Sequence, residues 1–275
     1  MAKTGAAERI APQPWMTEAA TASVLGALGG TARFVGGCVR DALLGRAIVD
    51  IDIATPLLPE EVMRRLEAAG IKAVPTGLDH GTVTAVAPPR RFEVTTLRRD
   101  VETDGRHARV AFTDDWAADA SRRDFTMNAL FLDAEGRVFD PMGGLPDLHA
   151  GRVRFVGDPA TRIREDVLRI LRFYRFQAHY GRGEADPPAR ADCRALAPLL
   201  PSLSGERVAA ELLKLLAAPD PMPTLRLMAA DGVLAMLLPE ARRLARLAAL
   251  IPLEGIGDPL RRLAALLDDG AAAIA

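Results

Sequence analysis

The sequence contains little lysine, histidine, cysteine or aromatic side chain. Lysine occurs only at positions 3, 72 and 214, so nearly all of the cationic side chains are arginine. The two cysteines, Cys38 and Cys193, are too few for a disulfide framework and lack the spacing of a zinc site. The chain also lacks a signal peptide and an apolar run long enough to span a membrane. We therefore expect a cytoplasmic protein with no membrane partner.

The formal net charge of −1 gives no overall positive field that would favour nucleic acid. A local basic patch is nonetheless present, because eight arginines lie between residues 152 and 182 against three acidic residues. A compositional bias toward arginine explains much of this excess, although arginine is also a good bidentate ligand for phosphate. The length of 275 residues allows one large or two ordinary domains.

A short run near the N-terminus has the clearest chemical pattern. Gly36-Gly37 is followed, after twelve residues, by Asp50-Ile51-Asp52-Ile53. Alternate side chains of a strand face the same way, so we expect Asp50 and Asp52 to project together from a strand over 49–54 while the isoleucines pack on the other face. Two carboxylates held so close repel unless a cation lies between them. Oxygen ligands of this kind suit Mg²⁺.

The residues around this run extend the pattern. The glycine pair offers a place where backbone N–H groups can approach a phosphate, and Arg40, one helical turn beyond Gly37, can reach the same group. If two metal ions act together, a third carboxylate is expected, and Glu93 is the candidate. Its position in Phe92-Glu93-Val94-Thr95 fits an exposed strand glutamate equally well. Together these features indicate nucleotidyl transfer.

The remaining sequence pattern divides the chain into an α/β portion up to about residue 154 and a helical portion after it. We expect helices over 17–28, 39–44, 59–69 and 119–127, and strands over 32–35, 49–54, 72–74, 81–87, 91–97, 129–133 and 137–140. The polar segment 98–118 is expected to be an irregular, functional loop. In the helical portion we expect helices over 165–179, 206–216, 224–230 and 239–250.

Further motifs stand in order over about residues 30 to 220, and together they carry a family resemblance. They are Gly36-Gly37-Cys38-Val39-Arg40-Asp41, Asp50-Ile51-Asp52, Gly77-Leu78-Asp79-His80-Gly81-Thr82-Val83, Glu93-Val94-Thr95-Thr96-Leu97-Arg98, Arg122-Arg123-Asp124-Phe125-Thr126-Met127-Asn128-Ala129-Leu130, Asp140-Pro141-Met142-Gly143-Gly144, Glu165-Asp166-Val167-Leu168-Arg169 and Ser204-Gly205-Glu206-Arg207. With these motifs the chain resembles the class II tRNA nucleotidyltransferases, the bacterial CCA-adding enzymes of the polymerase-β-like superfamily. Bacterial poly(A) polymerases share much of the same framework.

The resemblance implies an α+β fold. A polymerase-β-like nucleotidyltransferase head over 1–154, with a mixed sheet and flanking helices, would be followed by an all-α neck over 155–220 and a partial, truncated helical body over 221–275. The implied reaction is template-independent addition of CCA to tRNA 3′ ends from CTP and ATP, with no protein partner required.

The resemblance also implies roles for single residues. Asp50 and Asp52 would bind Mg²⁺ with the assistance of Glu93, and Gly36, Gly37 and Arg40 would contact the triphosphate. The motif that contains Arg122, Arg123, Asp124 and Asn128 is associated with the sugar of the nucleotide and with the domain junction.

A stripe of charged residues recurs every three positions in the helical portion, namely Asp166, Arg169, Arg172 and Arg175. Aspartate and arginine can read the edge of a base, but the same spacing fits salt bridges on a solvated helix face. The resemblance implies that Asp166 and Arg169 read the incoming base. Arg172 and Arg175 would orient this pair or support the triphosphate.

Two alternatives stay open at this level. A poly(A) polymerase would use ATP alone, and it usually carries a strongly basic extension that this sequence lacks. An RNA- or nucleotide-binding remnant without full activity fits the short helical portion, whereas the intact carboxylates argue against it.

Overall fold

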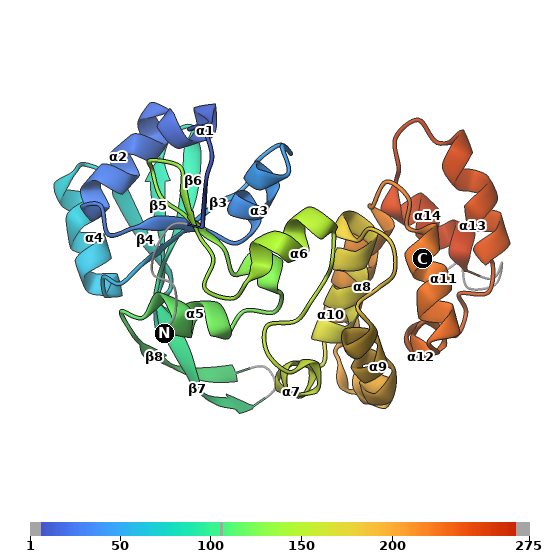
Figure 1. The fold of residues 1–275 in the computed structure, drawn as a ribbon. Coiled ribbons are helices and arrows are strands. Elements are labelled where there is room, and N and C mark those ends of the chain that lie inside the picture. The colour runs from blue at the N-terminus through green and yellow to red at the C-terminus, as the bar shows by residue number, and fades with distance from the viewer. Residues whose placement is uncertain (1–6, 105–106, 268–275) are drawn as a thin grey trace. The chain divides into compact units, whose positions relative to one another are not determined.

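The computed structural model describes residues 7–104 and 107–267, without the side chains of residues 101–109. The chain divides into two compact units, Met1–His149 and Ala150–Ala275 (Figure 1). None of the helices in the described ranges has the length and hydropathy that crossing a membrane requires.

The first unit is built on an eight-stranded sheet with the strand order β1-β10-β9-β2-β3-β6-β5-β4. The strands are β1 (Glu8–Arg9), β2 (Arg33–Val35), β3 (Ile51–Thr55), β4 (Lys72–Gly77), β5 (Thr82–Ala87), β6 (Arg90–Thr96), β9 (Phe131–Leu132) and β10 (Arg137–Phe139). Strands β3 and β6 pair in parallel, whereas the other described neighbours in this sheet pair antiparallel. The mixed sheet confirms the expected α+β class.

Short helices flank this sheet (Figure 1). They are α1 (Pro14–Thr17), α2 (Ala19–Leu28), α3 (Gly37–Leu43), α4 (Pro59–Ala68), α5 (Trp116–Ser121) and α6 (Gly144–Ala150), with 3₁₀ turns η1 (Leu78–His80) and η2 (Thr126–Asn128). Helices α2 and α4 pack against each other and against β5. The core of the sheet includes the buried side chains of Phe34, Ile51, Ile53 and Phe92. The two isoleucines therefore pack inward, as the alternation along 50–53 predicted.

The expectation of an irregular loop over 98–118 was wrong. The segment forms a separate antiparallel hairpin of β7 (Arg98–Asp104) and β8 (His107–Phe112), followed by α5. A two-stranded ribbon need not bury one face, so it can form without the apolar alternation that marks a strand in a sequence. Residues 105 and 106, at the centre of the expected loop, lie outside the described residues.

Two predicted helices of the first unit also differ from the structure. The helix expected over 17–28 does not include Thr17, which ends α1, and α2 begins only after Glu18. The expected helix over 119–127 is instead α5 followed by the 3₁₀ turn η2. Helix α5 begins earlier because the Asp115 side chain accepts a hydrogen bond from the backbone N–H of Ala117 and caps it.

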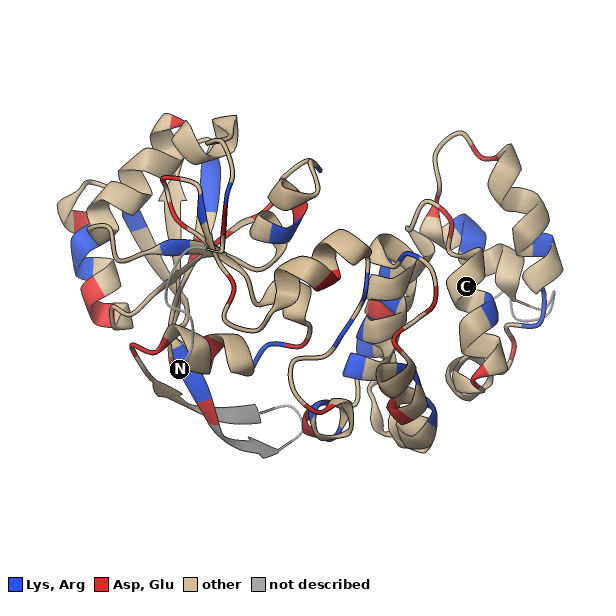
Figure 2. Ribbon diagram, viewed as in Figure 1, with Lys and Arg blue, Asp and Glu red and all other residues tan. Residues whose placement is uncertain are grey.

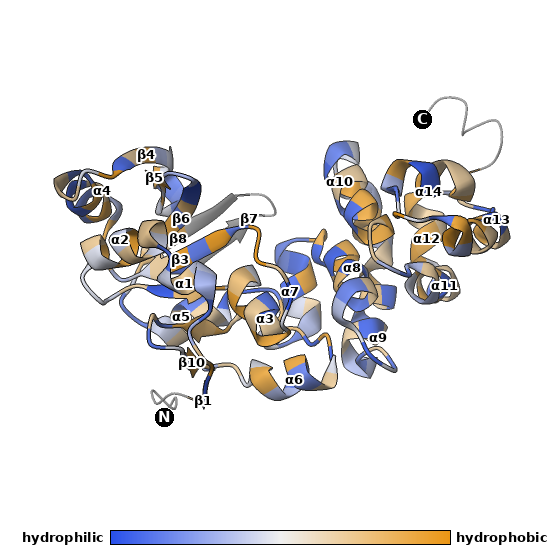
Figure 3. Ribbon diagram, turned by 90° about the horizontal axis from the view of Figure 1, so that it is seen from above, coloured by the Kyte–Doolittle hydropathy of each residue, from blue (hydrophilic) through white to orange (hydrophobic). Residues whose placement is uncertain are grey.

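Within residues 150–267 the second unit contains helices and no strand. Its helices are α7 (Pro159–Glu165), α8 (Arg169–Tyr180), α9 (Pro187–Leu196), α10 (Gly205–Leu216), α11 (Met222–Ala230), α12 (Val233–Leu237), α13 (Leu244–Leu250) and α14 (Pro259–Leu266), with 3₁₀ turns η3 (Ala197–Ser202) and η4 (Ile251–Leu253). Helix α8 packs on α10 and α11, and α10 also packs on α14. Helices α8 and α10 each combine hydrophobic and hydrophilic positions, as expected of helices with one buried face (Figure 3).

The single helix expected over 165–179 is broken at Asp166. Helix α7 ends at Glu165, Asp166 has an extended backbone with φ −153° and ψ 107°, and α8 begins at Arg169. The Asp166 carboxylate accepts a hydrogen bond of 3.1 Å from the backbone N–H of Leu168. This bond to a nearby backbone group stabilises the break, which is why Asp166 does not continue the helix.

Candidate functional site

The acidic residues of the first unit meet at the parallel pair of strands. Asp52 on β3 lies directly opposite Glu93 on β6 in the strand register. Opposite residues of paired strands project from the same face, so the two carboxylates are neighbours. Asp50 is exposed and lies one residue before β3, so the prediction that it sits on the strand beside Asp52 was wrong. Its charge nevertheless reaches Asp52.

The electrostatics of Asp52 show this proximity. Burial, the negative charge of Glu93 and, to a smaller extent, that of Asp50 raise the pKa of Asp52 to about 6, although Arg123 opposes the rise. A cation placed beside Asp52 would stabilise its ionised form, which burial and the neighbouring negative charges disfavour.

The donor set suits a hard divalent cation such as Mg²⁺. In the described parts of the chain no three His, Cys, Asp or Glu side chains converge as a complete metal cage. Mg²⁺ is usually held by one or two carboxylates together with water and substrate phosphates, so it needs no such cage. Asp52 together with one of its acidic neighbours, Asp50 or Glu93, therefore fits this ion.

The glycine pair forms the turn between β2 and α3. Gly36 has φ 74° and ψ −124°, in a region that favours glycine, and it precedes the first residue of α3. A Cβ atom on Gly36 would lie 3.6 Å from the Arg123 Nη1 atom, and one on Gly37 would lie 3.7 Å from the Arg40 Nη2 atom. The turn thus brings bare backbone next to two guanidinium groups.

A cavity of about 200 Å³ joins this turn to the carboxylates. Its lining residues are Gly37, Cys38, Arg40, Asp41, Ala47, Ile48, Val49, Asp50 and Asp52. The Cys38 thiol is buried and donates to the backbone oxygens of Val35 and Asp52, and burial raises its pKa to about 12. Cys38 is thus a structural residue of the cavity wall.

Three predicted residues form one hydrogen-bonded chain beside the cavity. Arg40 is buried and donates to both carboxylate oxygens of Asp41, at 3.1 and 2.7 Å. It also donates to the Asn128 side-chain oxygen at 2.8 Å, and Asn128 in turn donates to Asp124 at 3.0 Å. The structure therefore brings Arg40, Asn128 and Asp124 together and fixes the arginine through protein contacts.

The two neighbouring arginines of the same motif, Arg122 and Arg123, share one acidic partner but differ in their other neighbours. The buried Asp119 accepts from Arg122 with one carboxylate oxygen and from Arg123 with the other. Arg122 also donates to the backbone oxygen of Arg98, at the base of the β7–β8 hairpin, whereas Arg123 lies beside Gly36 and acts electrostatically on Asp52. Arg123 is thus the member of the pair that faces the carboxylates. Sequence reasoning missed Asp119, although its i, i+3 and i, i+4 spacing to the arginines was a signal.

The charged stripe of the second unit does not form the salt bridges at three-residue spacing that a solvated helix face would have. Asp166 binds Arg207 of α10, at 2.8 and 3.0 Å, rather than Arg169. Arg169 donates to Glu165 at 2.5 Å and to the backbone oxygen of Arg162 at 2.9 Å. The acidic and basic members of the predicted pair are therefore held by separate partners, and both side chains stay partly exposed.

Further along α8, the arginines converge on a buried acid. The Arg175 Nε atom lies 2.7 Å and the Arg172 Nη1 atom 3.8 Å from carboxylate oxygens of Glu211, which is 5 % exposed. Glu211 and Arg207 are four residues apart on α10. One face of α10 therefore contacts Asp166, Arg172 and Arg175. Basic positions recur along α8 in Figure 2. Arg207 stood in a matched motif without a predicted role, and no sequence signal pointed to Glu211.

Comparisons with known proteins agree on one group of relatives. Residues 32–154 match the poly A polymerase head domain, and residues 185–244 match a probable RNA and SrmB-binding site of polymerase A. The mitochondrial CCA tRNA nucleotidyltransferase 1 of Danio rerio is 47 % identical over 190 residues, which are 67 % of this chain and 43 % of the relative. The CCA-adding enzyme of Streptococcus gordonii is 46 % identical over 197 residues, which are 70 % of this chain and 48 % of the relative.

Solved structures give the same result. The crystal structure of the Bacillus stearothermophilus CCA-adding enzyme in complex with CTP matches with a TM-score of 0.73 and 38 % identity. The match covers 85 % of this chain and 56 % of that one. The chain thus spans about half the length of the curated relatives that it matches.

Proposed function

Because this chain belongs to the family of class II CCA-adding enzymes and poly(A) polymerases, we propose that it adds C, C and A to tRNA 3′ ends from CTP and ATP. The head carries the transfer chemistry, and the helical unit selects the nucleotide. One observation carries the proposal, namely that Asp52 and Glu93 face each other beside a cavity shared by Asp50 and the glycine turn.

Different residues of the head have different roles in the transfer. Asp50 and Asp52 hold Mg²⁺ with the assistance of Glu93, and the bound ion supplies activation of the 3′ hydroxyl and charge neutralisation at the phosphates. Gly36 and Gly37 present backbone to the triphosphate, and Arg123 and Arg40 offer guanidinium groups on the same side. The network of Asp119, Asn128 and Asp124 keeps these arginines oriented before the nucleotide arrives.

Selection of the base falls to Asp166 and Arg169. The Asp166 carboxylate offers acceptors and the Arg169 guanidinium offers donors, and separate ion pairs with Arg207 and Glu165 hold each of them in place. Uracil and guanine would leave these polar groups without matching partners, which costs binding free energy. We propose that Arg172 and Arg175, fixed by Glu211, support this pair.

The test of the site uses labelled CTP and a tRNA that ends before its CCA terminus. The double variant Asp50→Ala/Asp52→Ala should lose incorporation of C, whereas the matched control Asp114→Ala, an exposed head acid, should keep it. Unchanged incorporation in the double variant would remove Asp50 and Asp52 from the chemistry.

A poly(A) polymerase is the second candidate, because the matched head domain is described for that enzyme. It would use ATP alone, so incorporation from CTP alone excludes it. The cytoplasmic location stays a prediction, since the similar proteins include mitochondrial ones.

A further inference from the structure

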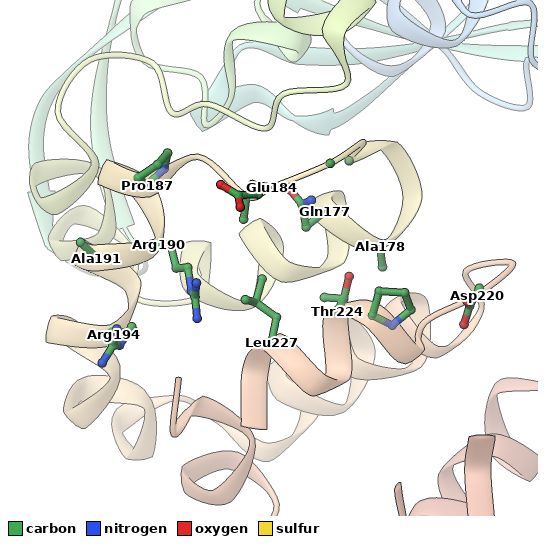
Figure 4. Close-up of a pocket in the computed structure, with 14 residues that line it drawn as sticks. Gln177, Ala178, Glu184, Pro187, Arg190, Ala191, Arg194, Asp220, Thr224 and Leu227 are labelled. Atoms are coloured by element: carbon green, nitrogen blue, oxygen red, sulfur yellow. The ribbon is translucent and has the colours of Figure 1, made fainter. Parts of the chain in front are cut away.

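The 3′ end of an RNA acceptor has to be held in the head, because the head carries the acidic residues of the proposed transfer. A cavity of about 700 Å³ between α8, α9 and α11 (Figure 4) belongs to the second unit instead. Most of its lining falls in the segment 185–244, which matches a probable RNA and SrmB-binding site of polymerase A. In the head, the open face of the sheet beside Glu93 offers a place for the acceptor.

Strand β5 has one buried face and one open face. Val83 and Ala85 are fully buried, and α2 and α4 contact this strand. The alternate residue Thr84 is partly exposed. Thr84 lies opposite Glu93 in the strand register, and Glu93 lies opposite Asp52. Opposite residues project from the same face, so a hydroxyl group lies one strand away from the carboxylates.

The hydroxyl of Thr84 is paired with that of Thr76. The two Oγ1 atoms are 2.8 Å apart, and Thr76 is exposed on the edge strand β4. One hydroxyl donates to the other, so the pair keeps one proton to donate and further lone pairs to accept with. The pair can therefore both donate to and accept from another hydroxyl group. A ribose 2′-hydroxyl has the same two capacities, and it distinguishes RNA from DNA.

A row of cationic side chains lies next to the hydroxyl pair on the same face. Arg91 and Lys72 are the cross-strand neighbours of Val86 on its two sides, and both are exposed. Arg91 precedes Glu93 by two residues on β6, so the two side chains share a face about 7 Å apart along the strand. Both cations are therefore available to a phosphate group.

The position of the glycine turn decides from which side an acceptor approaches. Gly36 and Gly37 follow β2, which lies on one side of β3, whereas β6, β5 and β4 lie on the other side. In-line transfer places the attacking and leaving oxygens on opposite sides of the phosphorus. With the triphosphate at the glycine turn, the attacking 3′-hydroxyl comes from the side of Glu93 and Thr84.

We propose that the Thr84–Thr76 pair hydrogen-bonds the 2′-hydroxyl of the acceptor's terminal ribose. Arg91 and Lys72 bind a phosphate of the same strand. Cross-strand neighbours are about 5 Å apart, so a 3′-hydroxyl at Glu93 brings the adjacent 2′-hydroxyl of the same sugar within reach of Thr84. The contact thereby selects acceptors that end in ribose. The inference rests on the proposed function, because it takes RNA as the acceptor.

The experiment compares two acceptors that differ in one hydroxyl group. Each is a tRNA that ends before its CCA terminus, and its last nucleotide carries either ribose or 2′-deoxyribose. With CTP and Mg²⁺, kcat/KM of the wild type should be about tenfold higher for the ribose end, which equals about 1.4 kcal/mol. Thr84→Val should reduce this preference to about twofold or less by lowering kcat/KM for the ribose acceptor alone.

Two further variants make this test specific. Thr76→Val, at the exposed end of the pair, should reduce the preference in the same direction. Thr31→Val removes an exposed hydroxyl that precedes β2, and it should keep the preference. Equal use of the two acceptors by the wild type, or an equal loss on both in Thr84→Val, would overturn the ribose contact. Incorporation of C would still stand in these cases, so the proposed function survives them. No incorporation on either acceptor by the wild type would remove the proposed function and the inference with it.

A binding measurement tests the phosphate contact without turnover. In metal-free buffer, Arg91→Met should raise the Kd of a fluorescently labelled acceptor about fivefold and weaken its dependence on salt, because one phosphate contact is lost. Arg64→Met is the matched control, since Arg64 is exposed on α4 and lies outside the sheet, and it should leave Kd unchanged. An unchanged Kd in Arg91→Met would contradict the phosphate contact.

Discussion

Replacing Asp52 by asparagine should stabilise the metal-free protein, although it removes a residue proposed to be essential for activity. Asp52 lies opposite Glu93 and near Asp50, and burial and these two charges raise its pKa from 3.8 to about 6. Asparagine has nearly the same shape without the negative charge. The variant therefore removes a repulsion that the folded metal-free protein has to bear.

The magnitude follows from the pKa of Asp52. A rise from 3.8 to about 6 corresponds to about 3 kcal/mol of unfavourable free energy once the carboxyl group is ionised in both states. Removing the asparagine side chain from water on folding also costs free energy. We therefore expect the free energy of unfolding to rise by about 1–3 kcal/mol. Because the folded state binds the proton more tightly, this cost is absent below pH 3.8 and grows as the pH rises through about 6.

The assay is thermal or urea unfolding followed by tryptophan fluorescence. Trp15 and Trp116 are the only tryptophans of the chain and both belong to the first unit, so the signal reports the head. At pH 8 without metal, Asp52→Asn should raise Tm by roughly 3–9 °C. At pH 4 the difference should nearly vanish. Millimolar Mg²⁺ should stabilise the wild type but not the variant.

The control is Asp114→Asn, which removes the same charge from an exposed position of the head. It should leave Tm unchanged at both pH values. The reasoning is refuted if Asp52→Asn is no more stable than the wild type at pH 8, or if its gain is the same at pH 4 and pH 8. Either result would mean that Asp52 bears no repulsion from its acidic neighbours.

Three further predictions concern the ion pairs of the two units. Asp119→Asn should cost about 3–5 kcal/mol in urea unfolding at pH 8, because it leaves two arginines without their buried acid. Burial alone would raise the pKa of Asp119, but these arginines hold it below its usual value, so the cost should shrink as the pH falls below about 4. Glu211→Gln should lower the free energy of unfolding by about 3 kcal/mol, whereas Lys214→Met, which alters an exposed partner of the same acid, should change it by less than about 1 kcal/mol. Asp166→Ala should weaken the preference for CTP and ATP over UTP and GTP by at least about tenfold, measured as kcat/KM for each nucleotide, with a small change in Tm. Loss of all activity with the preference intact would contradict the role of Asp166.

The sequence pattern predicted the faces of β3 better than its limits. Alternation showed that Ile51 and Ile53 would be buried, and they are. It could not show that the strand starts at Ile51, since that start depends on the pairing of Ile51 with Phe92. The same pairing sets Glu93 opposite Asp52. No local pattern contains a contact between strands so far apart in the sequence, which is why spacing alone left Glu93 open.

In the helical unit the apolar period was a poor guide at one point. Hydrophobic residues continue at helical spacing through 167–176, so the periodicity predicted one helix and hid the break. Asp166 causes this break through its bond to the Leu168 N–H. Its partner Arg207, and the acid Glu211 that holds the later arginines, come from α10. Tertiary packing chooses such partners, so sequence spacing could not identify them.

We propose that this chain completes tRNA 3′ ends with C, C and A. The most direct test is to size the products formed with Mg²⁺ from a tRNA that ends before its CCA terminus. With CTP and ATP together we expect a product longer by CCA and no further growth, and with CTP alone a product longer by CC. A long tail formed from ATP alone, or no extension with any of the nucleotides, would rule out CCA addition.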